Sequence, residues 1–317
     1  MKALMKFAIP AIMIAAAATA QAAQLSVDAS SAIPHDVQQL VTIDYHEMEN
    51  SNAAMELRAR VMPPALQRFE DALKSSGLNE NHDVEQLAFA LFRAKEGDEN
   101  LETVSIAQGQ FSVPDILANF RKQHLKGTLV RNNKVYPLAK TGMVVCFVNP
   151  STMVFGGPEA VNKALDARDG VSPSVLSNAP VMEAMKSVNT EPLWSILDQK
   201  GTQTMMRMVL GEAGSLTDYD TSVKKHLENS WYSMNFQHGV KFDLTIATND
   251  NFAAATLTSL LSAGVALRKA NGSEAEKQAL SATTVASNAG RITVHFATGE
   301  AQFNNLLQSP LFSVMVR

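Results

Sequence analysis

The sequence predicts an α+β protein of two similar halves, each a mostly antiparallel sheet with helices packed on one face. Short segments alternate apolar and polar residues, as strands with one buried face do. Apolar stripes at helical spacing lie between them, and the order of these elements recurs along the 317 residues. Strands joined by short turns favour antiparallel pairing under a layer of helices. We therefore expect one unit over 33–170 and a second over 180–317, joined by a linker rich in Gly, Pro and Ser at 168–180.

The first half begins with alternating residues and continues through short apolar runs separated by turn signals. Asn132-Asn133 is expected to form a hairpin turn, because Asn tolerates positive φ. Helices are expected where a cap-like residue or a proline precedes an apolar stripe. The expected strands are 41–45, 87–92, 103–107, 128–131, 134–136, 143–148 and 152–155, and the expected helices cover 51–62 and begin again at Pro63-Pro64, Ser112 and Pro158.

The second half repeats this order of elements. Its clearest strand carries Phe242, Leu244 and Ile246 on one face, between polar neighbours. Residues 252–267 hold 16 uncharged residues including Thr and Ser, which predicts a buried helix and is too short for a membrane span. The expected strands are 193–197, 231–236, 241–248 and 292–296, and the expected helices are 203–210, 250–267, 274–287 and a last one carrying Phe303.

Two pairs of segments resemble each other across the halves. Residues 103–117 resemble 243–257, and 152–161 resemble 292–301. Each segment reads as a strand, a polar turn and the start of a helix. A repeated order is explained by a repeated packing unit that covers the same sheet face, so we predict an internal duplication.

Residues 1–22 have the order of a secretory signal peptide. Lys2 and Lys6 precede a 12-residue apolar run, and Ala20-Gln21-Ala22 forms a small-x-small cleavage site. The apolar run is shorter than the roughly 20 residues that a membrane span needs. We therefore expect a cleaved signal, no integral membrane span after cleavage, and a mature protein in the periplasm or outside the cell.

Charge and cysteine content limit the partners. Removal of 1–22 removes two lysines and no acid, so the mature chain keeps 31 acidic and 25 basic residues and a net charge of −6. No Lys/Arg cluster offers the basic face that nucleic acid or an anionic membrane surface requires. Cys146 is the single cysteine, so an internal disulfide is excluded.

The strand–turn–helix segment 153–165, which carries Gly156-Gly157-Pro158, follows an export signal and lies inside a duplicated chain. In this respect residues 33–317 resemble exported bacterial proteins of uncharacterised families. The resemblance implies export and the α+β architecture. It implies no activity, cofactor or site residue.

The acidic segment 44–49 is the candidate catalytic cluster. Asp44 and His46 would share a face of a strand, with Glu47 beside them, and such a group could serve as an acid–base site. The solvated end of an edge strand explains the same residues. His-Glu-x-x-His is absent and Cys146 has no cysteine partner, so we predict neither a metal site nor a cofactor.

Other candidates have structural explanations. Gly156-Gly157 lacks the spacing of phosphate loops, and the chain has no Gly-x-Ser-x-Gly elbow. Cys146 lies in an apolar run and is expected to be buried and unreactive, whereas His295 is expected to face solvent or a helix cap. Met205, Met206 and Met208, expected near Trp194, would fill an irregular core or line a ligand pocket.

These observations favour an exported, non-enzymatic binding or envelope-associated protein. The first alternative is a carrier of an apolar small molecule, which a cavity lined by Met and Leu would support. The second is a hydrolase whose site is assembled from residues distant in sequence. A partner would be a protein or an apolar small molecule, and the sequence leaves the oligomeric state open.

Overall fold

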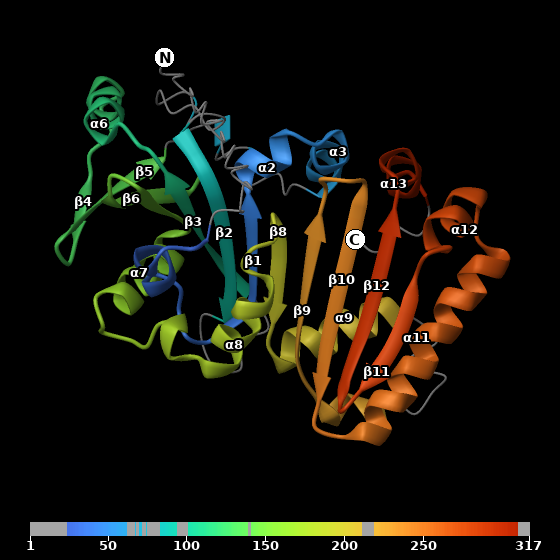
Figure 1. The fold of residues 1–317 in the computed structure, drawn as a ribbon. Helices are drawn as coiled ribbons and strands as arrows, with labels where there is room; N and C mark the ends of the chain where they lie inside the picture. Colours follow the sequence, from blue (N-terminus) through green and yellow to red (C-terminus); the bar gives the residue numbers. More distant parts are fainter. Residues whose placement is uncertain are drawn as a thin grey trace, which may run out of the picture.

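The computed structural model describes residues 24–61, 83–93, 101–138, 141–210 and 219–309, together with positions 67, 70, 71 and 74. The expected signal peptide lies outside these residues, as does the start of the helix expected at Pro63-Pro64, although positions 67, 70, 71 and 74 are helical. The described part of the chain forms one 12-stranded sheet in which all neighbouring strands are antiparallel, covered by helices. The α+β class predicted from the sequence is therefore confirmed (Figure 1).

The sheet is continuous from one end of the molecule to the other. Its order is β11-β12-β10-β9-β8-β1-β2-β3-β7-β6-β5-β4, and β1 pairs with β8 to join the N-terminal and C-terminal strands. The strands are β1 (Val37–Asp44), β2 (Val84–Arg93), β3 (Leu101–Gly109), β4 (Thr128–Val130), β5 (Asn133–Leu138), β6 (Met143–Asn149), β7 (Thr152–Gly156), β8 (Leu193–Leu197), β9 (Leu227–Asn235), β10 (Val240–Thr248), β11 (Thr284–Asn288) and β12 (Arg291–Thr298).

Helices lie on both sides of this sheet. They are α1 (Val27–Ser31), α2 (Tyr45–Glu49), α3 (Asn52–Val61), α6 (Val113–Lys122), α7 (Pro158–Arg168), α8 (Ala179–Val188), α9 (Gln199–Leu210), α11 (Asn251–Asn271), α12 (Glu274–Leu280) and α13 (Glu300–Leu307), with short helical turns at Val175–Ser177, Tyr219–Val223 and Lys224–His226. Several begin at a side-chain cap. Asp250, for example, accepts a 2.7 Å bond from the Ala253 amide, which satisfies a free N–H in the first turn of α11.

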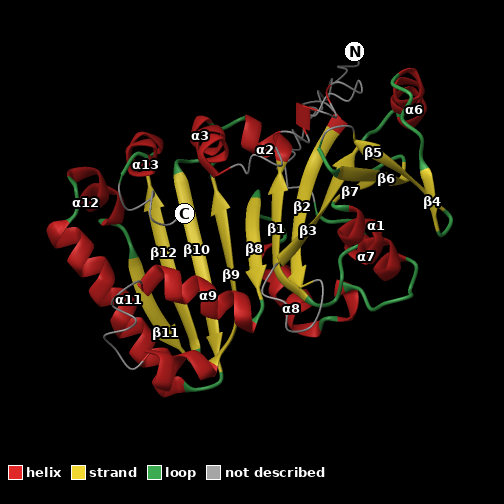
Figure 2. Cartoon of the chain, turned by 180° about the vertical axis from the view of Figure 1, so that it is seen from behind, coloured by secondary structure: helices red, strands yellow, loops and turns green. Residues whose placement is uncertain are grey.

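Side-chain alternation along the strands distinguishes the two faces of the sheet. We call them the α11 face and the α7 face. On the α11 face, Leu244, Ile246 and Ile292 pack against α9 and α11, and Phe296 packs with α3, α12 and α13. Figure 2 shows α9 lying across β9, β10 and β12 on this side. Helix α6 covers the same face of the N-terminal strands through Phe120, which packs with Phe155.

The α7 face is covered over the N-terminal strands and, by α8, over β8 and part of β9. Helices α1, α7 and α8 bury a cluster there that includes Phe92, Ile106 and Trp194. The N-terminal strands thus carry helices on both faces, which corrects the expectation of helices on one face. Two covered faces require apolar residues throughout a strand, and all five residues of β7 are buried.

Beyond β9, the described residues place no helix over the α7 face. We call this region of β9, β10 and β12 the open face. Its side chains are Trp231, Ser233, Asn235, Lys241, Asp243, Thr245, Arg291, Thr293 and His295. An antiparallel sheet tolerates one solvated face because its residues alternate apolar and polar, and β10 and β12 do so.

Three local expectations were wrong. The helix expected over 274–287 ends at Leu280, and Thr284–Asn288 forms β11, where Thr284 and Val285 suit a strand paired with β12. Residues 168–180 are not a free linker, because they contain a helical turn and the start of α8, which is capped by Asn178. In the hairpin between β4 and β5, the positive φ belongs to Arg131 and not to Asn132-Asn133.

Candidate functional site

The predicted acid–base cluster is divided between two elements. Strand β1 ends at Asp44, and His46 and Glu47 belong to α2, so Asp44 and His46 do not share a strand face. Asp44 is buried, and its Oδ1 accepts a 2.9 Å bond from the Glu47 amide. The carboxylate therefore caps α2, whereas the His46 side chain is exposed. Within the described ranges, no group of three or more His, Cys, Asp or Glu side chains is arranged to hold a metal ion.

The paired glycines before α7 have a packing role. Gly156 has φ +151°, and a Cβ there would lie 2.9 Å from the Thr103 carbonyl oxygen. Glycine thus allows β7 to approach β3 closely. Gly157 is the N-cap residue of α7, and Pro158 opens the helix.

Cys146 is completely buried, as expected from its apolar strand. Burial disfavours the thiolate and raises the Cys146 pKa to about 11. The positive charge of Arg168 favours the thiolate and offsets only part of this rise in pKa. The thiol is therefore protonated at neutral pH, and its low reactivity stays a prediction.

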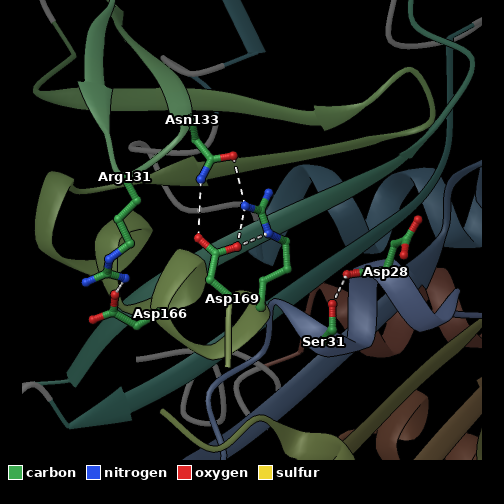
Figure 3. Close-up of polar contacts among 7 residues, drawn as sticks. Asp28, Ser31, Arg131, Asn133, Asp166 and Asp169 are labelled. Atoms are coloured by element: carbon green, nitrogen blue, oxygen red, sulfur yellow. Dashed lines mark hydrogen bonds and ion pairs between the residues drawn. The ribbon is translucent and has the colours of Figure 1, made fainter. Parts of the chain in front are cut away.

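A polar network near Cys146 joins the β4–β5 hairpin to the end of α7. Arg168 donates to Asn133 over 2.8 Å and forms an ion pair with Asp169, and Arg131 forms an ion pair with Asp166. Figure 3 shows these side chains directed toward one another from the hairpin and the helix. Because the acids and bases pair within the network, we assign it to positioning the hairpin.

The methionine cluster does not adjoin Trp194. Met206 is buried with α11 on the α11 face, and Met208 is 63% exposed, whereas Trp194 lies in the core under the α7 face. The sheet separates them, so the expected proximity of the methionines to Trp194 is wrong, and buried Met206 fills the core on the α11 face.

The open face brings together polar groups from distant segments. Register places Ser233, Asp243 and His295 side by side on β9, β10 and β12. His295 Nδ1 lies 2.7 Å from Asp243 Oδ1, and both side chains are about half exposed. His295 is thus solvent-exposed, as expected. When Nδ1–H donates to the carboxylate, Nε2 of the imidazole is left to face a ligand.

A depression of about 280 Å³ adjoins this pair. It is lined by Glu191, Ser233, Asn235, Gln237, His238, Lys241 and Asp243. Asn235 donates a 3.0 Å bond to Glu191, which holds the carboxylate over the end of β9. On the same face, the Arg291 guanidinium lies 5.9 Å from the Trp231 ring centroid, within cation–π range. The open face therefore offers carboxylates, amines, imidazoles, amides and an indole to one partner.

A second depression of about 530 Å³ lies between α12, β12 and the start of α13. Its lining includes Lys277, Gln278, Ser281, Thr298 and Gln302, so it is polar as well. Neither depression is the Met- and Leu-lined cavity that would support a carrier of an apolar molecule.

Sequence alternation was sufficient to place His295 toward solvent, but not to find its partner. Asp243 and His295 are 52 residues apart, and their contact depends on the register of β10 with β12. Regular alternation of polar residues on both strands was the available signal, and it identifies an exposed face without identifying which residues meet.

The protein thus belongs to the class of α+β proteins built on one wide antiparallel sheet, with a polar face left open at one end. Its architecture is similar to that of TP0453, a Treponema pallidum protein of unknown function. Crystal form I of TP0453 superposes with a TM-score of 0.53 at 11% sequence identity, over 89% of this chain and 97% of that chain. Crystal form III gives a TM-score of 0.50 at 11% identity, over 89% and 98%. At this identity the likeness shows a shared fold alone.

No protein-family model matches the chain. No curated protein matches its sequence. Within the described ranges, no helix has both the length and the hydropathy that a membrane crossing requires.

Proposed function

We propose that the protein is exported and processed, and that it acts in the periplasm or outside the cell. The support is the order of Lys2 and Lys6, the apolar run and the Ala20-Gln21-Ala22 site. N-terminal sequencing of the protein recovered from outside the cytoplasm should give a mature chain that begins at Gln21 or Ala23. Recovery of a chain that retains Met1 would contradict the proposal.

We propose further that it is a non-enzymatic binding protein whose partner occupies the open face. The observation that carries this proposal is the polar depression beside the Asp243–His295 pair, where no described helix covers β10 and β12 on the α7 face. Charged groups of both signs, amides and an adjacent Trp favour a hydrophilic partner with several hydrogen-bonding groups, such as a polar peptide segment. Polar groups arranged on paired strands are held rigidly, which limits the entropy lost on binding.

Loss of the Asp243–His295 pair should weaken binding at this face. The mature protein would be titrated, by calorimetry, with a panel of short soluble peptides that carry both charges and hydroxyl groups. For a peptide that binds, the double substitution Asp243→Ala and His295→Ala should lower affinity about tenfold or more, since a hydrogen bond to a charged group contributes about 1.5–3 kcal/mol.

The matched control is Glu56→Ala with Arg60→Ala, another partly exposed ion pair, which lies on α3 under the other face. It should leave affinity unchanged. Equal losses in both double variants, or no binding by any peptide of the panel, would oppose the assignment of the site.

We also infer that the chain contains an internal duplication. The strand order supports it. Outward from the β1–β8 junction, one side begins β1-β2-β3-β7-β6, with β5 and β4 beyond, and the other reads β8-β9-β10-β12-β11. In each series of five, three strands in chain order are followed by a hairpin whose second strand lies nearer the junction, and β5 and β4 have no counterpart in the second series. Units over 33–170 and 180–317 would share one sheet through β1 and β8.

The ladder registers support the same inference and refine its alignment. Val104 pairs with Gly156, and Asp243 pairs with His295. The separation in sequence from Val104 to Asp243 equals that from Gly156 to His295, so a single offset aligns both pairs. Sequence similarity had set Thr103 against Asp243. The pleat excludes that alignment, because Thr103 and Asp243 point to opposite faces.

The helices agree in part with a duplication. Helices α6 and α11, which follow β3 and β10, both lie on the α11 face. Helices α7 and α13, which follow β7 and β12, lie on opposite faces. Divergence of the two units would therefore include a move of the helix that became α13 from the α7 face to the α11 face of the sheet. This move would leave the α7 face open in the second unit.

A further inference from the structure

Strand β11 is an exposed edge of the sheet. It is the terminal strand in the sheet order, and in the described part of the chain it pairs with β12 alone. Four of its five residues are exposed, and Val285 is half-buried. An edge strand presents unpaired backbone N–H and C=O groups that can accept another strand.

This edge lacks three of the features that prevent pairing, which are charged residues, proline and a bulge. No charged residue and no proline occurs between Gln278 and Gly290, and the β11–β12 ladder shows no bulge. The opposite edge differs, because β4 has only three residues and is flanked by Lys126 and Arg131. Short length and flanking charge protect an edge from association, so the two ends of the sheet are not equivalent.

Helix α11 lies beside this edge. Both views show it running alongside β11 at the end of the sheet (Figures 1 and 2). Its inner side is buried through Leu257 and Leu261, as expected, but its outer side is exposed, with Phe252 75% and Leu267 60% exposed. Between these two residues the helix has no charge, and its exposed positions include Ala255 and Ala263.

We propose that β11 pairs antiparallel with β11 of a second copy of this chain, so that two sheets continue into one. A second copy is the occupant because a two-fold antiparallel pair centred on Ala286 sets this residue against its own copy and the other edge residues against one another. An uncharged edge meets no like charge in such a pair. The same axis, perpendicular to the sheet, keeps both copies of α11 on one side. Between Phe252 and Leu267 neither helix carries a charge, so their approach meets no like-charge repulsion.

Pairing in this way also places the two open faces on the same side of a continuous sheet. The dimer would thus present two copies of the Asp243–His295 pair to one partner. Self-association does not depend on the binding assigned to the open face, because β11 and α11 contribute no residue to the depression at Glu191 and Asp243.

Introducing a charge of either sign at Ala286 tests the proposal. Ala286 is the central residue of β11, exposed and directed to the α7 face beside Thr293. The mature wild-type protein should have twice the monomer mass in sedimentation equilibrium and dissociate on dilution. Ala286→Lys and Ala286→Glu should each be monomeric at concentrations where the wild type is dimeric, because like charges would meet across the axis. An equimolar mixture of the two variants should restore the dimer.

The control is Thr293→Lys, which adds the same charge to the same face one strand further in and should remain dimeric. A restored dimer in the mixture also shows that both Ala286 variants fold. A monomeric wild type over the whole concentration range, a dimer that persists in both Ala286 variants, or a mixture that stays monomeric would each overturn the proposal.

Discussion

Replacing Trp194 with alanine should destabilise the protein by about 3–5 kcal/mol, the range for loss of a large aromatic side chain from a core. Trp194 is 1% exposed and lies in the cluster that α1, α7 and α8 form on the α7 face. It lies on β8, which joins the two parts of the sheet through β1. Its loss would therefore leave a cavity at the junction of the N-terminal and C-terminal strands.

The Trp194 indole also has an unsatisfied donor. Its Nε1 has no hydrogen-bond partner among the described residues, and neither does the hydroxyl of Thr42, which is opposite it in the β1–β8 ladder. Trp194→Phe should therefore cost clearly less than Trp194→Ala, because it retains an aromatic ring and removes a buried, unpaired N–H.

Urea unfolding followed by circular dichroism measures both substitutions. Cys146, buried in the same cluster, supplies a second reading, since its labelling by a thiol reagent requires opening of this core. Labelling should be faster in the alanine variant than in the wild type. A loss of less than about 1 kcal/mol for Trp194→Ala would mean that the core can collapse around the missing ring.

Replacing Gly109 with alanine should destabilise the protein by about 3 kcal/mol, at or above the upper end for overpacking. A Cβ at this position would lie 1.8 Å from the Asp83 carbonyl oxygen and 3.0 Å from the Val84 Cα. These are backbone atoms that no side-chain rotation can move away. The Asp83 carbonyl also accepts a 2.9 Å bond from the Gln110 amide, so displacement would disturb the end of the β2–β3 ladder.

Gly157→Ala is the matched control for Gly109→Ala. Gly157 has φ −60°, and a Cβ there meets no atom within 4 Å. It should change the free energy of unfolding by less than about 1 kcal/mol, the scale of a weak helix cap. Thermal unfolding of the two variants gives the comparison, and equal melting temperatures would show that the segment around Asp83 yields to the added methyl group.

Local patterns were sufficient to predict most elements and the α+β class. Phe242, Leu244 and Ile246 alternate with polar residues, and β10 has the corresponding buried and exposed sides. Asp250 precedes an uncharged run and caps α11. Alternation and capping act between residues near in sequence, so a single sequence contains them in full.

Competition between local and tertiary preferences explains the errors. Residues 281–287 carry Ser and Ala that a helix accepts, but the exposed edge of β12 was available, and Thr284 and Val285 extend it. At Asp44 and His46, strand periodicity was applied two residues too far, because Asp44 is both the last residue of β1 and the N-cap of α2.

By itself, the sequence determined the class of fold, most of its strands and helices, the burial of Cys146 and the exposure of His295. Only the tertiary structure decided that β1 and β8 join one sheet, that Trp194 and Met206 lie on opposite faces, and that Asp243 meets His295. The reason is physical. Periodicity specifies which side of a strand is buried, whereas strand order and register depend on packing between segments that are distant along the chain.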